Sequence, residues 1–414
     1  MKIDRFLPAL VAVTVSLAIG CARKADYKPL IPQGTVLASV SHDRQFRDNP
    51  VLQGIRQASD ELQKKQYDEL WTEWGENAPL TPELARVLSM NSPQLIQYLC
   101  GENADIEWML LTVGASGLLN NDDDSFSVPP AALVICLNQP LDLADPLAKI
   151  RKLAEDQWNS LDEQDKTFEE ALENFFQEME WESGIRISET TYQERTALRV
   201  TIKDSEIEGN IEGLSPILAT IGDGRLIALA VNERHLDELS ELYAGRLPAL
   251  DATTPLAKEM ALPNDVYSRA AIADIPRVMR KFLSASQWEN FTEAMEEDEE
   301  IGPYILSTQT LRLDVALDSA SMSMVFRVEV DMDSEDRASS LGYLAQAGKS
   351  ALSMGAQMLS AQNRELAFLA DWVGNLDCGN RGKTTFATFS FTSDDIRKLD
   401  DVRQLYPSIF EDAF

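Results

Sequence analysis

The chain has 414 residues, of which 44% are hydrophobic and 25% are charged, so it has the composition of a globular protein and is long enough for two compact domains. Its 37 Lys and Arg residues against 68 Asp and Glu residues give a formal net charge of −31. A surface of that sign repels phosphate backbones, which excludes nucleic acid as a partner. It also opposes adsorption to anionic lipid headgroups, so contact with a membrane requires a covalent or apolar anchor.

The amino terminus has the layout of a secretory signal. Lys2 and Arg5 form a positively charged start, and a mainly apolar run follows from Phe6 to Ile19. That run is shorter than the roughly 20 apolar residues of a membrane-spanning helix. It ends in the sequence Leu17-Ala18-Ile19-Gly20-Cys21, in which a small residue stands directly before the cysteine.

This ending resembles the lipobox of bacterial lipoproteins, and the resemblance covers residues 1–21 only. It implies removal of residues 1–20 as a signal peptide, thioether attachment of diacylglycerol to Cys21, and acylation of the new amino terminus, for example with palmitate. Ala18 stands where such motifs usually have Leu. Because Ala22 rather than Asp follows the cysteine, the resemblance implies the outer membrane in a two-membrane bacterium. Residues 21–30 are expected to be a tether of about 30 Å at most. An ordinary signal peptide, or a buried Cys21, is the alternative.

Three further cysteines are present. Cys136 lies in an apolar run from Ala131 to Leu137, which predicts a buried and inert thiol. Cys100 and Cys378 could form a disulfide, which their spacing alone does not decide, and an odd number of cysteines leaves at least one thiol free. The absence of a CxxC pair in the sequence gives no support for redox chemistry.

The first half of the body begins with a strand at 35–41. Asn49 is expected to cap a helix whose first residue is Pro50 and whose apolar positions recur at helical spacing as far as Trp74. Further elements are predicted as follows: helices after Thr81-Pro82 and Ser92-Pro93; strands at 106–113 and 131–137 around a polar hairpin tip at 120–125; a helical region at 142–181; strands at 185–188, 197–202, 216–221 and 226–231; and a helix at 235–243. Gly222-Asp223-Gly224 suits the positive φ angles of a tight hairpin.

Residues 246–261 contain prolines and polar spacers and are expected to be a linker. The second half then has strands at 266–272, 310–317, 323–330 and 384–391. A long acidic-capped helix is predicted to run to about Val373, and a last short helix to begin at 393–396. Gly342, Ala345, Gly348, Ala351 and Gly355 are small enough to permit close packing of the long helix against a sheet or another helix.

Two stretches of the chain repeat one layout. Both 31–59 and 262–284 contain an apolar residue and Pro, a polar turn, a β-rich run, and then Pro with a helical pattern. The downstream elements follow the same order, β-α-β-β-α-β-β, twice. We therefore predict an α+β fold of two related modules, each a mostly antiparallel sheet with helices packed on it. The first module is 31–245, with an extra hairpin and helix, and the second is 262–414. A single α+β domain without a repeat is the alternative.

No motif for catalysis, a cofactor or a metal emerges from the sequence. Only two histidines exist, His42 and His235, and both are expected at the surface. Zinc-ligand spacing and glycine-rich phosphate loops are absent from the sequence. The acidic clusters 122–124 and 296–300 lack the spacing of a calcium loop, so solvated surface is favoured for both. We therefore predict no catalytic, cofactor-binding or metal-binding residue, with lipidation of Cys21 as the one assigned site.

Aromatic residues fall on the predicted helical stripes and are expected in the core. These are Trp71, Trp74, Trp158, Phe168, Phe175 and Phe176. If part of such a stripe is exposed, it would form a groove for a partner or an apolar ligand.

The combined prediction is a membrane-anchored envelope lipoprotein with a non-enzymatic binding or assembly role, whose partner is a protein or small ligand. Two alternatives stay open. One is a hydrolase that uses a pair of carboxylates on envelope glycans, and the other is a solute-binding component.

Overall fold

A computed structural model describes residues 27–42, 44–74, 92–114, 129–160, 185–202, 214–282, 285–298, 301–362 and 366–398, with short pieces at 83, 86–87, 90, 126–127 and 211–212. The predictions for Cys21, the hairpin tip at 120–125 and the aromatic residues at 168–176 lie outside these residues. Trp71, Trp74 and Trp158 lie in described helices, but their side chains are outside what the structure describes.

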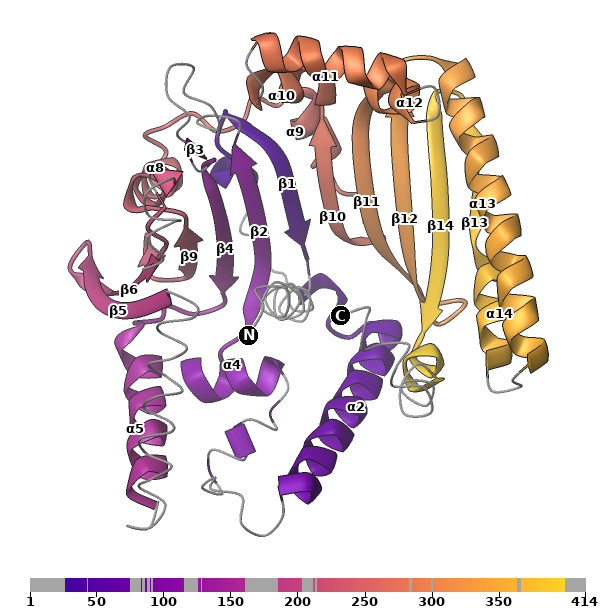
Figure 1. The fold of residues 1–414 in the computed structure, drawn as a ribbon. Coiled ribbons are helices and arrows are strands. Elements are labelled where there is room, and N and C mark those ends of the chain that lie inside the picture. Colours follow the sequence, from indigo (N-terminus) through magenta and orange to yellow (C-terminus); the bar gives the residue numbers. More distant parts are fainter. Residues whose placement is uncertain are drawn as a thin grey trace.

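Twelve antiparallel strands form one sheet in the order β13-β14-β12-β11-β10-β1-β2-β4-β9-β8-β6-β5 (Figure 1). In chain order the strands are β1 (Thr35–Ser41), β2 (Ile106–Gly114), β4 (Ala131–Leu137), β5 (Ile185–Tyr192), β6 (Arg195–Ile202), β8 (Ile217–Ile221), β9 (Leu226–Ala230), β10 (Val266–Ala273), β11 (Thr308–Asp318), β12 (Ser323–Met332), β13 (Asp377–Arg381) and β14 (Thr384–Thr392). A separate short pair joins β3 (Phe126–Ser127) and β7 (Ile211–Glu212) in parallel. The predicted α+β class is confirmed.

The sheet is continuous across the middle of the chain. β1 and β10 pair along five residues, from Leu37 opposite Ile272 to Ser41 opposite Ser268. The linker predicted at 246–261 packs against both halves: it contains the helix α9 (Pro255–Glu259), and Leu256 and Met260 are buried. The two halves of the chain therefore share one sheet, and the largest buried cluster beneath it contains residues of both halves.

One face of the central strands is covered by η2 (Lys28–Leu30), α8 (Glu233–Tyr243) and α9. Tyr27 and Leu30 are buried in this core, and the Tyr27 hydroxyl donates a hydrogen bond to the Met260 carbonyl at 2.7 Å. The stretch 27–30, predicted as part of the tether, is thus part of the body, which leaves 21–26 as the segment between it and Cys21.

The remaining helices lie around the borders of the sheet (Figure 1). They are α2 (Pro50–Trp74), α4 (Ser92–Cys100), α5 (Ala144–Ser160), α10 (Ile275–Phe282), α11 (Ala285–Glu297), α12 (Gly302–Ser307), α13 (Glu335–Gln362) and α14 (Ala367–Asn375), with a short η3 (Arg44–Phe46) before α2. The start of α2 packs on Leu317 and Met324, whereas α4 packs beside Met109 and Ile135. None of the described helices is long and apolar enough to cross a membrane.

Most of the predicted local signals are confirmed. The Asn49 side chain accepts a hydrogen bond from the Val51 amide at 2.9 Å, as expected of a cap before Pro50. Gly222 and Gly224 have φ angles of 62° and 88° in the turn that joins β8 to β9. The capping of α8 was missed: the Asn232 side chain accepts from the His235 amide.

One prediction for the second half is wrong, and another is confirmed only in part. The long helix ends at Gln362, and a separate helix, α14, follows it. The edge strand β13, which comes after α14, was not predicted. The close packing expected of the small residues of α13 occurs at Gly342, which is buried against β13, whereas Gly348 and Gly355 have open space around them. A spacing of three residues falls about 60° short of a full helical turn at each step, so such a series drifts off the packed side.

Candidate functional site

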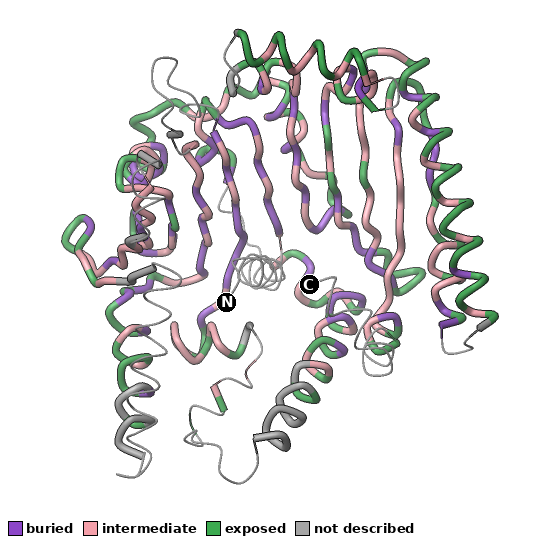
Figure 2. Tube along the Cα trace, viewed as in Figure 1, coloured by how far each residue is buried: buried purple, intermediate pink, exposed green. Residues whose placement is uncertain are grey.

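Burial alternates residue by residue along the central strands. On β1, Ala38 and Val40 are buried, whereas Leu37 and Ser39 between them are half-buried. The same alternation occurs on β4, β9 and β10 and, from Leu110 onward, on β2 (Figure 2). Because side chains in a strand point to opposite faces in turn, one face of the sheet is covered and the other is partly open.

The partly open face carries two rows of paired apolar residues. The first row crosses seven strands through Leu229, Leu133, Leu111, Ser39, Ala270, Leu313 and Val328, each opposite the next. The second row lies two residues along the strands, through Val113, Leu37, Ile272, Leu311 and Val330. These twelve residues are called the open face below.

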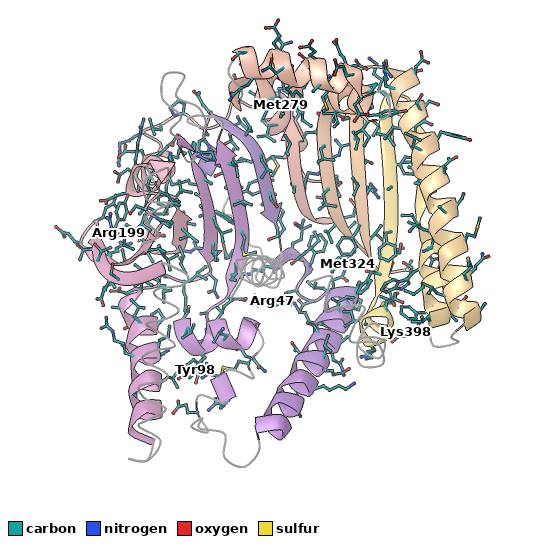
Figure 3. The ribbon with its side chains drawn as sticks, in the orientation of Figure 1. Arg47, Tyr98, Arg199, Met279, Met324 and Lys398 are labelled. Atoms are coloured by element: carbon teal, nitrogen blue, oxygen red, sulfur yellow. The ribbon has the colours of Figure 1, made fainter. Side chains whose placement is uncertain are left out.

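Four large apolar side chains of the open face are exposed to solvent. Leu229, Leu311, Leu313 and Val328 are 39%, 37%, 41% and 38% exposed, and the others are half-buried. An isolated exposed leucine needs no explanation, but paired neighbours make a contiguous apolar surface. Figure 3 shows the side chains of this half of the sheet between the labelled Met279 on α10 and Met324 near the start of β12.

The covered face of the same strands contains the buried charges. Arg269 on β10 and Asp314 on β11 form a bidentate ion pair. The Arg269 Nε and Nη2 atoms donate to Asp314 Oδ1 and Oδ2, each at 2.6 Å. Arg312, two residues before Asp314, is paired with Glu329 and Glu259. An antiparallel sheet with one solvated face usually turns polar residues outward and apolar residues inward. In this half of the sheet the arrangement is reversed.

The buried carboxylates are held by arginines. Glu107 on β2 receives a hydrogen bond from Arg44 at 2.6 Å and another from Arg225 at 2.9 Å. Asp314 is likewise held by Arg269. In each case both carboxylate oxygens accept from arginine side chains, so the charges of these buried acids are matched inside the protein.

Both histidines are half-buried, so the prediction that they lie at the surface is only partly right. The His42 ring packs on the Tyr27 ring at 5.1 Å between centroids. His235 lines a small cavity of about 60 Å³ beneath α8, together with Thr35. Among the residues that the structure describes, neither the His235 Nδ1 nor the Thr35 Oγ1 has a hydrogen-bond partner, and the cavity has room for water that would supply one. Burial lowers the pKa of His235, and Arg234 lowers it further.

The three cysteines of the described part are free thiols, so Cys100 and Cys378 do not pair. Cys136 is buried as predicted, and burial raises its pKa to about 12. Burial also raises the pKa of Cys100. Both shifts disfavour the reactive thiolate.

Glu296 and Glu297 are exposed at the end of α11, and Asp298 directly after the helix is half-buried, while 299–300 and 122–124 lie outside the described residues. Within the part of the chain that the structure describes, no three His, Cys, Asp or Glu side chains cluster in a way that could hold a metal ion.

A second apolar surface lies on α13. This helix packs on β13 at Gly342, and Ala356 further along it is also buried, while its larger apolar residues are exposed. Met354 and Met358 are 65% and 62% exposed. They serve below as a matched apolar control outside the sheet.

Comparison with known proteins adds little. No protein family matches the chain, and no curated protein matches it. Among solved structures, the chain is similar to one titled "Structure of crystal form I of TP0453", at 7% sequence identity over 92% of this chain and 99% of that chain. The TM-score of 0.29 is too low for this likeness to support any inference.

Sequence reasoning missed the open face. Its strands were found, but nearly every position on both faces of β1, β2 and β4 is apolar or small, so alternation did not show which face is covered. The signal present in the sequence was the mixed pattern of β11 and β12, where charged residues alternate with Leu and Val.

Proposed function

We propose that this protein is a membrane-anchored lipoprotein of a bacterial cell envelope with a non-enzymatic binding role, and that the open face is its binding surface. The observation that carries the proposal is the reversed polarity of β10 to β12, where Leu311 and Leu313 face outward and Arg269 and Asp314 face inward. Leaving large apolar residues in water forgoes roughly 25 cal/mol per Å² of stabilisation, which binding of an apolar partner would recover.

The geometry favours binding over catalysis. The hydrolase alternative requires two carboxylates on the floor of a cleft, one of them able to carry a proton. The buried acids Glu107 and Asp314 are instead neutralised by arginines. A solute-binding role is compatible with the open face if the solute is apolar.

The membrane anchor is part of the same proposal and is supported by the lipobox-like sequence that ends at Cys21. Diacylglycerol together with an amide-linked acyl chain holds a protein on a bilayer much more strongly than one chain does. A short segment, 21–26, would then join the anchor to the buried Tyr27 and keep the sheet near the membrane surface.

Internal duplication also belongs to the proposal. From the central pair outward, the strands run β1-β2-β4-β9-β8 on one side and β10-β11-β12-β14-β13 on the other. The hairpin β5-β6 is the addition to the first copy. This mirrored order supports two modules at 31–245 and 262–414 that have merged their sheets.

Two measurements test the proposal. Cys21→Ser is expected to move the protein from the membrane fraction to the soluble fraction; retention on the membrane would contradict the anchor. The second compares Nile red fluorescence for the Cys21→Ser protein with and without Leu313→Asn and Val328→Asn. Loss of fluorescence with this pair, but not with Met354→Asn and Met358→Asn on α13, is expected. Equal fluorescence in all three proteins would contradict binding at the open face.

A further inference from the structure

We infer that the open face binds the two acyl chains of a zwitterionic diacyl lipid, laid across the strands. The inference rests on the proposed function and names the ligand class for the same surface.

The chemistry of the rows fits hydrocarbon. Of the twelve side chains of the open face, Ser39 alone can form a hydrogen bond, and none is charged. A ligand with polar groups along its length would lose hydrogen bonds to water without replacement, at a cost of about 1–3 kcal/mol for each group. An acyl chain has no such groups.

The dimensions fit two chains. Neighbouring strands lie about 4.8 Å apart, so the first row spans roughly 29 Å from β9 to β12 and the second roughly 19 Å from β2 to β12. The acyl chains of one leaflet occupy about half of the roughly 30 Å hydrocarbon core of a bilayer. Each row is therefore long enough for one chain. The rows are about 7 Å apart, since they differ by two residues along each strand.

Other occupants fit less well. An added peptide strand requires an unpaired sheet edge, but every strand from β9 to β12 is paired on both sides. A second copy of the chain would bring two molecules of net charge −31 together. The same charge opposes anionic lipids, and no cationic side chain belongs to the open face to hold the carboxylate of a free fatty acid. A zwitterionic diacyl lipid avoids both difficulties.

The test uses the full chain with Cys21→Ser, so that its own lipid cannot fill the face. This reference protein is incubated with vesicles of phosphatidylcholine that contain a pyrene-labelled phosphatidylcholine, and with labelled palmitate in a separate arm. Protein is separated from vesicles, and the lipid carried with it is quantified by mass spectrometry. The open-face variant carries Leu111→Asn and Leu313→Asn, and the control variant carries Met354→Asn and Met358→Asn.

We expect the reference and control proteins to carry about one phosphatidylcholine each, and the open-face variant to bind it at least about tenfold more weakly. A tenfold change corresponds to about 1.4 kcal/mol, which is no more than the transfer of one buried leucine side chain. Circular dichroism establishes that the variants are folded.

Four outcomes would overturn the inference: no lipid on the reference protein, equal loss in the control variant, tighter binding of palmitate than of phosphatidylcholine, or a dimer in sedimentation that the open-face variant dissociates without any lipid bound. If Nile red binds at the open face while phosphatidylcholine does not, the inference fails and the proposed binding role stands.

Discussion

The openness of the sheet face predicts a large difference in stability between two leucine-to-alanine substitutions. Leu110 on β2 points to the covered face and is 0% exposed, whereas Leu313 on β11 points to the open face and is 41% exposed. Truncating a fully buried leucine costs about 2.7–5 kcal/mol, because transfer energy is lost and a cavity remains. Leu110→Ala should therefore lower the free energy of unfolding by about that amount.

Leu313→Ala should cost much less. Full burial of a leucine is worth about 1.5–3 kcal/mol, and Leu313 retains only about 60% of it, which gives about 1–2 kcal/mol with no enclosed cavity to add. The assay is urea unfolding of the Cys21→Ser protein followed by circular dichroism, with the slope m compared between variants. If both substitutions cost the same, Leu313 is covered in the native protein and the reasoning about an open face is refuted.

Three further predictions follow from side chains away from the open face. Asp314→Asn should cost about 3–5 kcal/mol in urea unfolding, since it leaves the Arg269 charge buried without its partner; a cost below about 1 kcal/mol, typical of exposed pairs, would contradict this. The thiol of Cys136, with its pKa near 12, should resist iodoacetamide at neutral pH until urea unfolds the protein, as peptide mapping would show; labelling of Cys136 in the native protein would count against it. His235 has a lowered pKa in the folded protein, so the unfolded chain takes up the proton first as the pH falls through the ordinary value of about 6.5. Stability should decline from there and level off below the folded pKa, and His235→Gln should remove part of the decline that begins near the ordinary value; an unchanged decline would show that other groups cause it.

The strands were predictable because each carries its own local signal. β4 was placed from its apolar run, and the β8-β9 hairpin from two glycines that adopt positive φ. The end of α13 was not predictable, because nothing in its composition stops a helix before Gln362. The edge strand Asp377–Arg381 was missed since it lacks the β-branched and aromatic residues that usually mark strands.

The open face could not be predicted from the sequence, for a different reason. Whether Leu37 or Ala38 faces the core depends on which elements cover β1, and those elements, α8 and α9, lie more than 190 residues further along the chain. The residue pattern did indicate two different faces at one place. On β11, Arg312 and Asp314 alternate with leucines, so one face of this strand had to be charged and the other apolar. That the charged face is the buried one follows only from Arg269 and Glu259, which complete the ion pairs.

The proposed duplication explains why a surface of this width exists at all. Within the first row, Leu229 to Ser39 spans three strand spacings and Ala270 to Val328 spans two, or roughly 14 Å and 10 Å. Neither half reaches the roughly 15 Å that the chains of one leaflet occupy, whereas the joined row exceeds it. Ser39 and Ala270 have the smallest side chains of the row. They lie opposite each other where β1 pairs with β10, so the side chains project least from the sheet at this point. Pairing of β1 with β10 also removes the two exposed edges that separate modules would present to aggregation. On this view the fusion of two sheets, rather than either module alone, makes the surface long enough for a lipid.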